Sequence, residues 1–75
     1  MNRQIFIDYW RLFEITGNPH ACALRIQSMT EHEINRIALG FIPSDHRRQA
    51  VRIAARWAKD ATTAEVESAI REAQS

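Results

Sequence analysis

The sequence predicts an all-α fold, a compact bundle of four to five short helices that forms a single domain over residues 1–75. Apolar residues recur with helical spacing, and no segment alternates with the period of two that is typical of a strand. The two glycines and two prolines all lie where helices should begin or end. A chain of 75 residues is also too short for a second hydrophobic core.

The first helix is predicted over residues 3–16. At 100° per residue, one arc of its surface holds six large apolar side chains, namely Ile5, Phe6, Tyr9, Trp10, Leu12 and Phe13. Gly17 follows this face, and we expect it to be the left-handed residue that ends the helix.

Capping residues define the next two helices. Asn18 as N-cap and Pro19 at the first helical position predict a helix over 19–28. Thr30 and Glu33 fit a capping box that opens a third helix, which should reach residue 39 and end at Gly40. The expected buried edge of this third helix is Ile34, Ile37, Ala38 and Phe41.

Two further helices complete the bundle. Ser44 is expected to cap a helix over 45–59, and Thr62 a last helix that ends near residue 73. The last helix carries a narrow apolar stripe of Val66, Ala69, Ile70 and Ala73. Eight of the eleven alanines lie in these two helices and their joint. Such small faces suit a tight antiparallel pair, either within one chain or across a homodimer, so self-association is expected.

The helix over 45–59 carries the surface with the clearest chemical character. Four basic side chains fall within an arc of roughly 80°, and we call them the basic ridge: Arg48, Arg52, Arg56 and Lys59. Residues 45–59 hold five basic residues and one acidic, whereas residues 60–75 hold four acidic and one basic.

Three interpretations of the basic ridge remain open. It could dock on an acidic protein surface, where such charges steer association, or it could follow the phosphates of DNA or RNA. It could also be a solvated face whose positive charge is balanced by the glutamates of the last helix, Glu65, Glu67 and Glu72. A helix-turn-helix fits poorly, because Arg36, His46 and Gln49 would stand where that motif needs small or apolar residues.

No catalytic residues, metal ligands or cofactors are predicted. His20 and Cys22 project about 200° apart on a helix and cannot easily share a metal ion. A nucleophilic Cys–His pair would also need an orienting group and an oxyanion hole, which the sequence does not offer. We therefore expect a protein that is not an enzyme.

The aromatic residues are expected to be core, yet one helix carries more large rings than a single neighbour can cover. Aromatic side chains are frequent anchors of protein interfaces, which makes Tyr9, Trp10 and Trp57 candidate interface anchors. No stretch approaches the roughly 20 apolar residues of a membrane span. The lone Cys22 and the absence of a signal-peptide pattern at the first residues favour a cytoplasmic location without membrane contact.

Residues 10–19 read W-x-x-F-x-x-T-G-N-P. This segment resembles very short bacterial and phage helical proteins of unknown function. The resemblance implies a helical geometry and an origin in a phage or mobile element. The leading hypothesis is a small regulatory protein that binds a larger host protein as an inhibitor or adaptor. The alternative is a small DNA- or RNA-binding regulator that uses the basic ridge.

Overall fold

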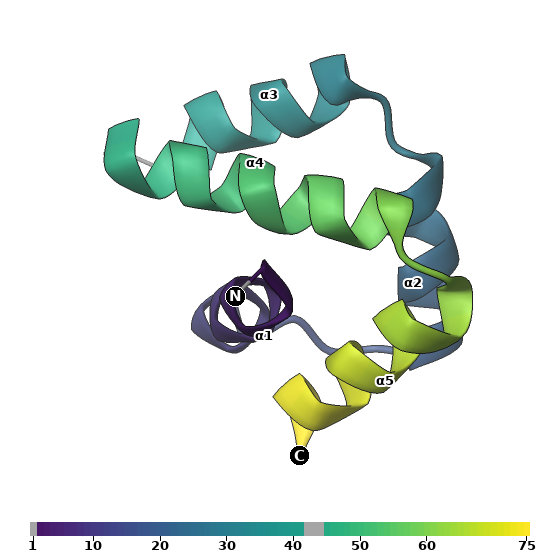
Figure 1. Ribbon diagram of the computed structural model, residues 1–75. Coiled ribbons are helices and arrows are strands. Elements are labelled where there is room, and N and C mark those ends of the chain that lie inside the picture. Colours follow the sequence, from purple (N-terminus) through teal and green to yellow (C-terminus); the bar gives the residue numbers. More distant parts are fainter. Residues whose placement is uncertain (1, 42–44) are drawn as a thin grey trace.

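The computed structural model describes residues 2–41 and 45–75, and every regular element within these ranges is an α-helix. They form five helices (Figure 1): α1 (Asn2–Leu12), α2 (Pro19–Ser28), α3 (Glu31–Phe41), α4 (Asp45–Asp60) and α5 (Thr63–Gln74). The predicted all-α class is confirmed. The Cα radius of gyration is 11.3 Å, close to the roughly 11 Å expected of a single domain of this length.

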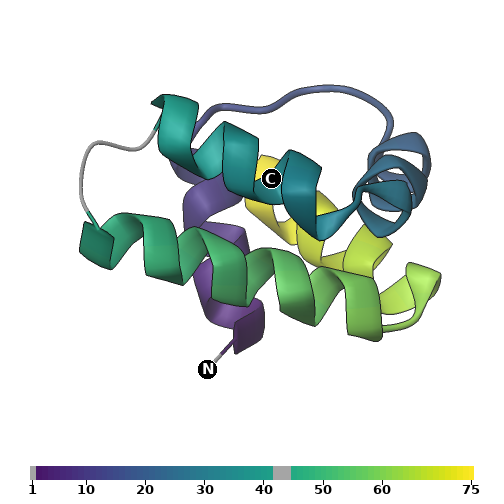
Figure 2. The same ribbon diagram turned by 90° about the horizontal axis from the view of Figure 1, so that it is seen from above.

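Helix α4 contacts three other helices, α1, α2 and α3. Helix α1 contacts α4 and α5, while α2 packs against the same two helices. Figure 1 shows α1 nearly end-on below α4, with α3 along the other side of α4. Seen from above, α3 and α4 lie side by side and α1 passes beneath them (Figure 2). Helix α3 therefore joins the rest of the molecule mainly through α4. None of the described helices is long and apolar enough to cross a bilayer.

The buried face of α1 differs from the predicted arc. Ile7, which that arc omits, is fully buried and lies beside the buried Phe6 and Trp10, whereas Leu12 is 60% exposed. The buried face is turned toward Ile7 by about a quarter of a turn, because α4 and α5 both pack on α1. As a result, one edge of the aromatic face is left partly uncovered.

Helix α1 also ends earlier than predicted, at Leu12 rather than residue 16. Glu14 has the left-handed φ of 51°, and its N–H donates to the Arg11 carbonyl at 3.1 Å. The Ile15 N–H donates to the Trp10 carbonyl at 3.5 Å, which completes a Schellman motif. Glu14 thus takes the place expected for Gly17, although Gly17 also has a positive φ of 125°. The turn brings the Ile15 backbone back to Trp10, and this hydrogen bond helps to hold Glu14 in its left-handed conformation.

The predicted caps of α2, α3 and α5 are present. The Asn18 side chain accepts a hydrogen bond from the Ala21 N–H at 3.0 Å, and α2 spans the predicted residues. The Thr30 hydroxyl accepts from the Glu33 N–H at 3.1 Å, while the Glu33 carboxylate accepts from the Thr30 N–H. The Thr62 hydroxyl caps α5 through the Glu65 N–H at 3.2 Å.

The expected stop at Gly40 is wrong, because α3 continues through it to Phe41. Glycine permits a left-handed turn without requiring one. The expected cap at Ser44 lies outside the described residues. Helix α4 begins at Asp45 as predicted and ends at Asp60.

The alanine faces are buried within the chain itself. Ala54 and Ala58 of α4 join Ala69 and Ala73 of α5 in one core with the fully buried Val66 and Ile70. The stripe predicted for the last helix is confirmed. The two helices do not form the expected close pair, because each packs on α1 and α2 instead.

The joint between α4 and α5 is held by Gln27 of α2. Its Nε2 donates to the carbonyls of Ala58 and Ala61 at 3.1 and 2.8 Å, and its Oε1 accepts from the Thr63 hydroxyl at 2.7 Å. These bonds satisfy carbonyls that the end of α4 would otherwise leave without a partner.

Candidate functional site

The basic ridge lies beside an open groove between α3 and α4. Arg52, Arg56 and Lys59 line this groove of about 610 Å³, and Arg48 is not among the described residues of its lining. Glu31 and Asn35 of α3 face them from the other wall. The structure therefore brings together three of the four ridge residues.

Contacts from the ridge cross this groove and tie α3 to α4. The Arg52 Nε donates to the Asn35 Oδ1 at 2.8 Å. Arg56 forms an ion pair with Glu31 and a second, weaker one with Asp60 at 3.9 Å. Both Arg56 and Glu31 are well exposed, so water screens their attraction. Two ridge arginines are thus already engaged with α3 or α4.

The remaining ridge residues differ in their surroundings. Arg48 pairs with Asp45 at 3.0 Å within the first turn of α4. The Lys59 side chain makes no ion pair or hydrogen bond with another described residue. Lys59 is therefore the ridge cation most available to an anionic ligand in the groove.

The glutamates of α5 form no ion pairs with the basic ridge among the described residues, although the interpretation of the ridge as a charge-balanced solvated face required such pairs. Glu67 binds Arg71 at 2.7 Å and His20 at 3.2 Å, and Glu72 binds Arg3 at 2.8 Å. The hydrogen bond from Arg71, followed by that from His20, holds the pKa of Glu67 below its ordinary value. The counter-charges of the ridge come instead from α3 and from α4 itself.

A second depression, the apolar hollow, lies where α1, α3 and α4 meet. It has a volume of about 170 Å³ and apolar walls. Its lining includes Trp10, Phe13, Ile15, Met29, Ile37 and Val51. The early end of α1 brings Phe13 and Ile15 to this place, and the turned face of α1 leaves the hollow open.

Three large side chains of the hollow remain exposed to water. The exposed fractions are 43% for Phe13, 37% for Ile15 and 44% for Ile37. The expectation that Ile37 lies on the buried edge of its helix is wrong, because Ile37 is exposed at the rim of the hollow whereas Ile34, one turn earlier, is buried. Of the other two side chains expected on that edge, Ala38 and Phe41, nothing is described. Exposed apolar side chains gathered around one depression are typical of a binding surface.

The predicted interface anchors separate into two places. Tyr9 and Trp10 both line the apolar hollow, although Trp10 is itself core and only 9% exposed. Trp57 is half-buried against Phe6, with ring centroids 5.4 Å apart, and it is not among the described residues that line the hollow. Sequence reasoning missed Ile15 and Ile37 as surface residues, since their exposure depends on where α1 ends and how far α4 reaches.

The part of the chain that the structure describes contains no cluster of His, Cys, Asp or Glu that could hold a metal ion. Comparison of the sequence and the structure with protein-family models, curated proteins and solved structures finds no match. Any functional interpretation therefore depends on the residues of the chain itself.

Proposed function

We propose that this chain is a small non-enzymatic regulatory protein of the cytoplasm, which binds another protein through the apolar hollow. The observation that carries this proposal is the open hollow with Phe13, Ile15 and Ile37 exposed at its rim. Full burial of a large apolar side chain is worth about 1.5–3 kcal/mol. Covering the exposed part of these three would add roughly 2–4 kcal/mol to association.

The more specific role, an inhibitor or adaptor from a phage or mobile element, depends only on the resemblance of residues 10–19. The homodimer stays a prediction, and its original motive is weaker because the alanine faces are buried within one chain. The hollow supports protein binding more directly than the basic ridge does, since contacts within the chain engage three of the four ridge residues.

Affinity capture from an extract of the source cell, treated with nuclease, tests this proposal. Ile37→Asp places a charge at the rim of the hollow, and Leu24→Asp makes the same change at a helical position that is 49% exposed and is not among the described lining residues of the hollow. We expect a stoichiometric partner protein that Ile37→Asp loses and Leu24→Asp retains. Equal capture by both variants would show that the hollow is not the binding surface.

The alternative function, binding of DNA or RNA, is favoured by one observation. Arg52, Arg56 and Lys59 share a groove of about 610 Å³ in which Lys59 has no partner among the described residues. An arginine that leaves an ion pair in order to bind phosphate exchanges one anion for another, so its net gain is small. We therefore expect weak binding.

The salt dependence of binding to duplex DNA separates the two functions. Each phosphate that a cation neutralises adds about 0.9 to the negative slope of log affinity against log salt. A ligand held by the whole ridge would give a slope near −3.6, whereas Lys59 and Arg52, which have no carboxylate partner among the described residues, would give about −1.8. We expect the shallow slope, and a steep slope that Lys59→Gln reduces by about one would establish the alternative.

A further inference from the structure

The walls of the apolar hollow restrict what can lie over it. A segment placed there finds apolar side chains and no free backbone donors or acceptors, because the described part of the chain has no strand edge to extend. A buried backbone group without a hydrogen bond is costly. A partner segment whose backbone is buried over the hollow must therefore satisfy its own backbone, as an α-helix does.

The size of the hollow restricts how deeply such a helix can enter. A cavity of roughly 150 Å³ accepts a benzene ring, and the hollow measures about 170 Å³. One bulky side chain, aromatic or branched aliphatic, fills it. The rim residues Phe13, Ile15 and Ile37 would then contact the flanking turns of the incoming helix.

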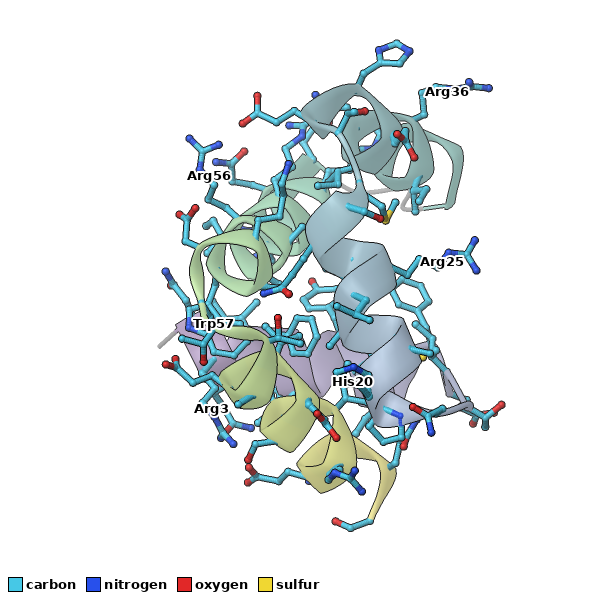
Figure 3. The ribbon with its side chains drawn as sticks, turned by 90° about the vertical axis from the view of Figure 1, so that its right-hand side faces the viewer. Arg3, His20, Arg25, Arg36, Arg56 and Trp57 are labelled. Carbon is cyan, nitrogen blue, oxygen red and sulfur yellow. The ribbon has the colours of Figure 1, made fainter. Side chains whose placement is uncertain are left out.

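The charges beside the hollow indicate the sign of the charge that its partner carries. A neighbouring depression of about 510 Å³ shares Met29 and Ile37 with the hollow and is also lined by Arg25 and Arg36. Figure 3 shows both arginines extending from the side of the molecule opposite to Arg3 and Arg56. Neither side chain makes an ion pair or hydrogen bond with another described residue. Unpaired guanidinium groups beside an apolar surface favour carboxylates.

The acidic residue in this depression does not cancel these charges. Glu33 also lines it, with its carboxylate bonded to the backbone N–H and the hydroxyl of Thr30. One carboxylate against the two guanidinium groups of Arg25 and Arg36 leaves the depression with a net positive charge. A second copy of the chain is a less favourable occupant than an acidic protein. An isologous contact brings the same patch of both copies together, and because each patch holds two guanidinium groups and one carboxylate, two net-positive surfaces would face each other.

We infer that the partner presents an amphipathic α-helix, with one bulky apolar side chain that enters the hollow and carboxylates about one turn away that pair with Arg25 and Arg36. This inference rests on the proposed function, because it names the kind of protein segment that the hollow binds. It uses a face of the molecule different from that of the basic ridge.

A displayed peptide library tests the inference without knowledge of the partner. Positions i, i+3, i+4 and i+7 of an alanine-rich host are randomised to all residues, proline included. Proline in the interior of a helix disrupts that helix, so depletion of proline would show that the bound peptides are helical. The library is selected on the wild-type protein and counter-selected on Ile37→Asp. We expect enrichment of one bulky apolar residue with Asp or Glu nearby, and depletion of proline.

Charge-reversal variants then test the two arginines with the enriched peptides. Arg25→Glu and Arg36→Glu should each weaken binding, the double variant at least tenfold, and Arg47→Glu is the matched control for each single charge reversal. Arg47 is exposed on α4, has no side-chain partner among the described residues and is absent from the described lining of the hollow. We expect this control to remain within twofold of wild type.

Four results would overturn the inference: enrichment of basic peptides, enrichment of proline-containing peptides, no enrichment, or an equal loss in the Arg47→Glu control. A wild-type dimer at 100 μM that Ile37→Asp dissociates, seen by analytical ultracentrifugation, would also overturn it in favour of a second copy. If cellular capture still depends on Ile37, the proposed function stands without this inference. If capture is indifferent to Ile37→Asp, the proposed function itself fails.

Discussion

Trp10 offers the sharpest test of the core, because its ring is buried while its polar atom has no partner. The side chain is 9% exposed and stacks on Phe6 with ring centroids 5.4 Å apart. The indole Nε1 is buried without an acceptor among the described residues. Two substitutions separate the contribution of the ring from that of the N–H group.

Trp10→Ala removes the ring and leaves a cavity. Such a change costs about 3–5 kcal/mol in a core. A domain of 75 residues has a free energy of unfolding of roughly 4–11 kcal/mol. We expect this variant to lose about half of its stability or to unfold.

Trp10→Phe keeps an aromatic ring next to Phe6 and removes the unpaired donor. The smaller ring costs about 1–2 kcal/mol of burial, while release of a buried N–H without a partner returns about 1–3 kcal/mol. The two terms oppose each other, so the free energy of unfolding should stay within about 1 kcal/mol of wild type.

Urea unfolding followed by circular dichroism at 222 nm measures both variants without depending on tryptophan fluorescence. Slopes of about 1–3 kcal/mol per molar urea are typical of small domains, so a 3 kcal/mol loss shifts the midpoint by 1 M or more. A Trp10→Phe variant as unstable as Trp10→Ala would mean that Nε1 has a partner after all. A Trp10→Ala variant that unfolds like wild type would refute the position of this ring in the core.

Three local features give further predictions. Glu14→Gly should raise the free energy of unfolding by about 0.5–1 kcal/mol, because glycine adopts the left-handed φ of 51° without strain; a loss in urea unfolding would mean that Glu14 has a contact of its own. Thr62→Ala should cost about 1 kcal/mol by removing the cap of α5, and Thr62→Ser should recover most of it. Folding lowers the pKa of Glu67 from 4.5, so its ionised carboxylate stabilises the fold at pH values above the unfolded pKa. This stabilisation is lost as the pH falls through the folded pKa. Thermal unfolding between pH 6 and pH 3 should therefore show a steeper loss in wild type than in Glu67→Gln, and parallel curves would contradict this.

Caps were predictable from the sequence because each involves residues only three positions apart. Asn18, Thr30 and Thr62 all cap where expected. The end of α1 was not predictable in the same way. Glu14 takes a strained turn because Ile15 can then return to Trp10, and the pattern of glycines does not contain that information.

The apolar hollow could not be predicted from the sequence, for a related reason. Periodicity gives the apolar face of a helix, but neighbouring helices determine which part of that face is covered. Ile7 is buried and Leu12 is exposed because α1 meets two helices at once. Ile34 is buried and Ile37 is not, although both lie on the same face of α3.

The basic ridge holds α3 in place, and this changes how its mutants must be interpreted. The Arg52–Asn35 hydrogen bond and the Arg56–Glu31 ion pair join α3 to α4, and α3 forms part of the hollow through Ile37. Arg52→Glu should therefore weaken partner binding through displacement of α3, even if the partner never touches the ridge.

A paired exchange distinguishes this indirect effect from direct contact. Arg52→Glu combined with Asn35→Lys restores an attraction between the two helices while the ridge position keeps its reversed charge. If the ridge acts through α3, the double variant recovers most of the affinity that Arg52→Glu loses, and the double-mutant cycle shows a coupling of about 0.5–3 kcal/mol. If the partner binds Arg52 itself, the double variant remains as weak as the single one. We expect recovery, since the contacts of Arg52 and Arg56 lead to α3 and the exposed apolar residues lie around the hollow that α3 helps to form.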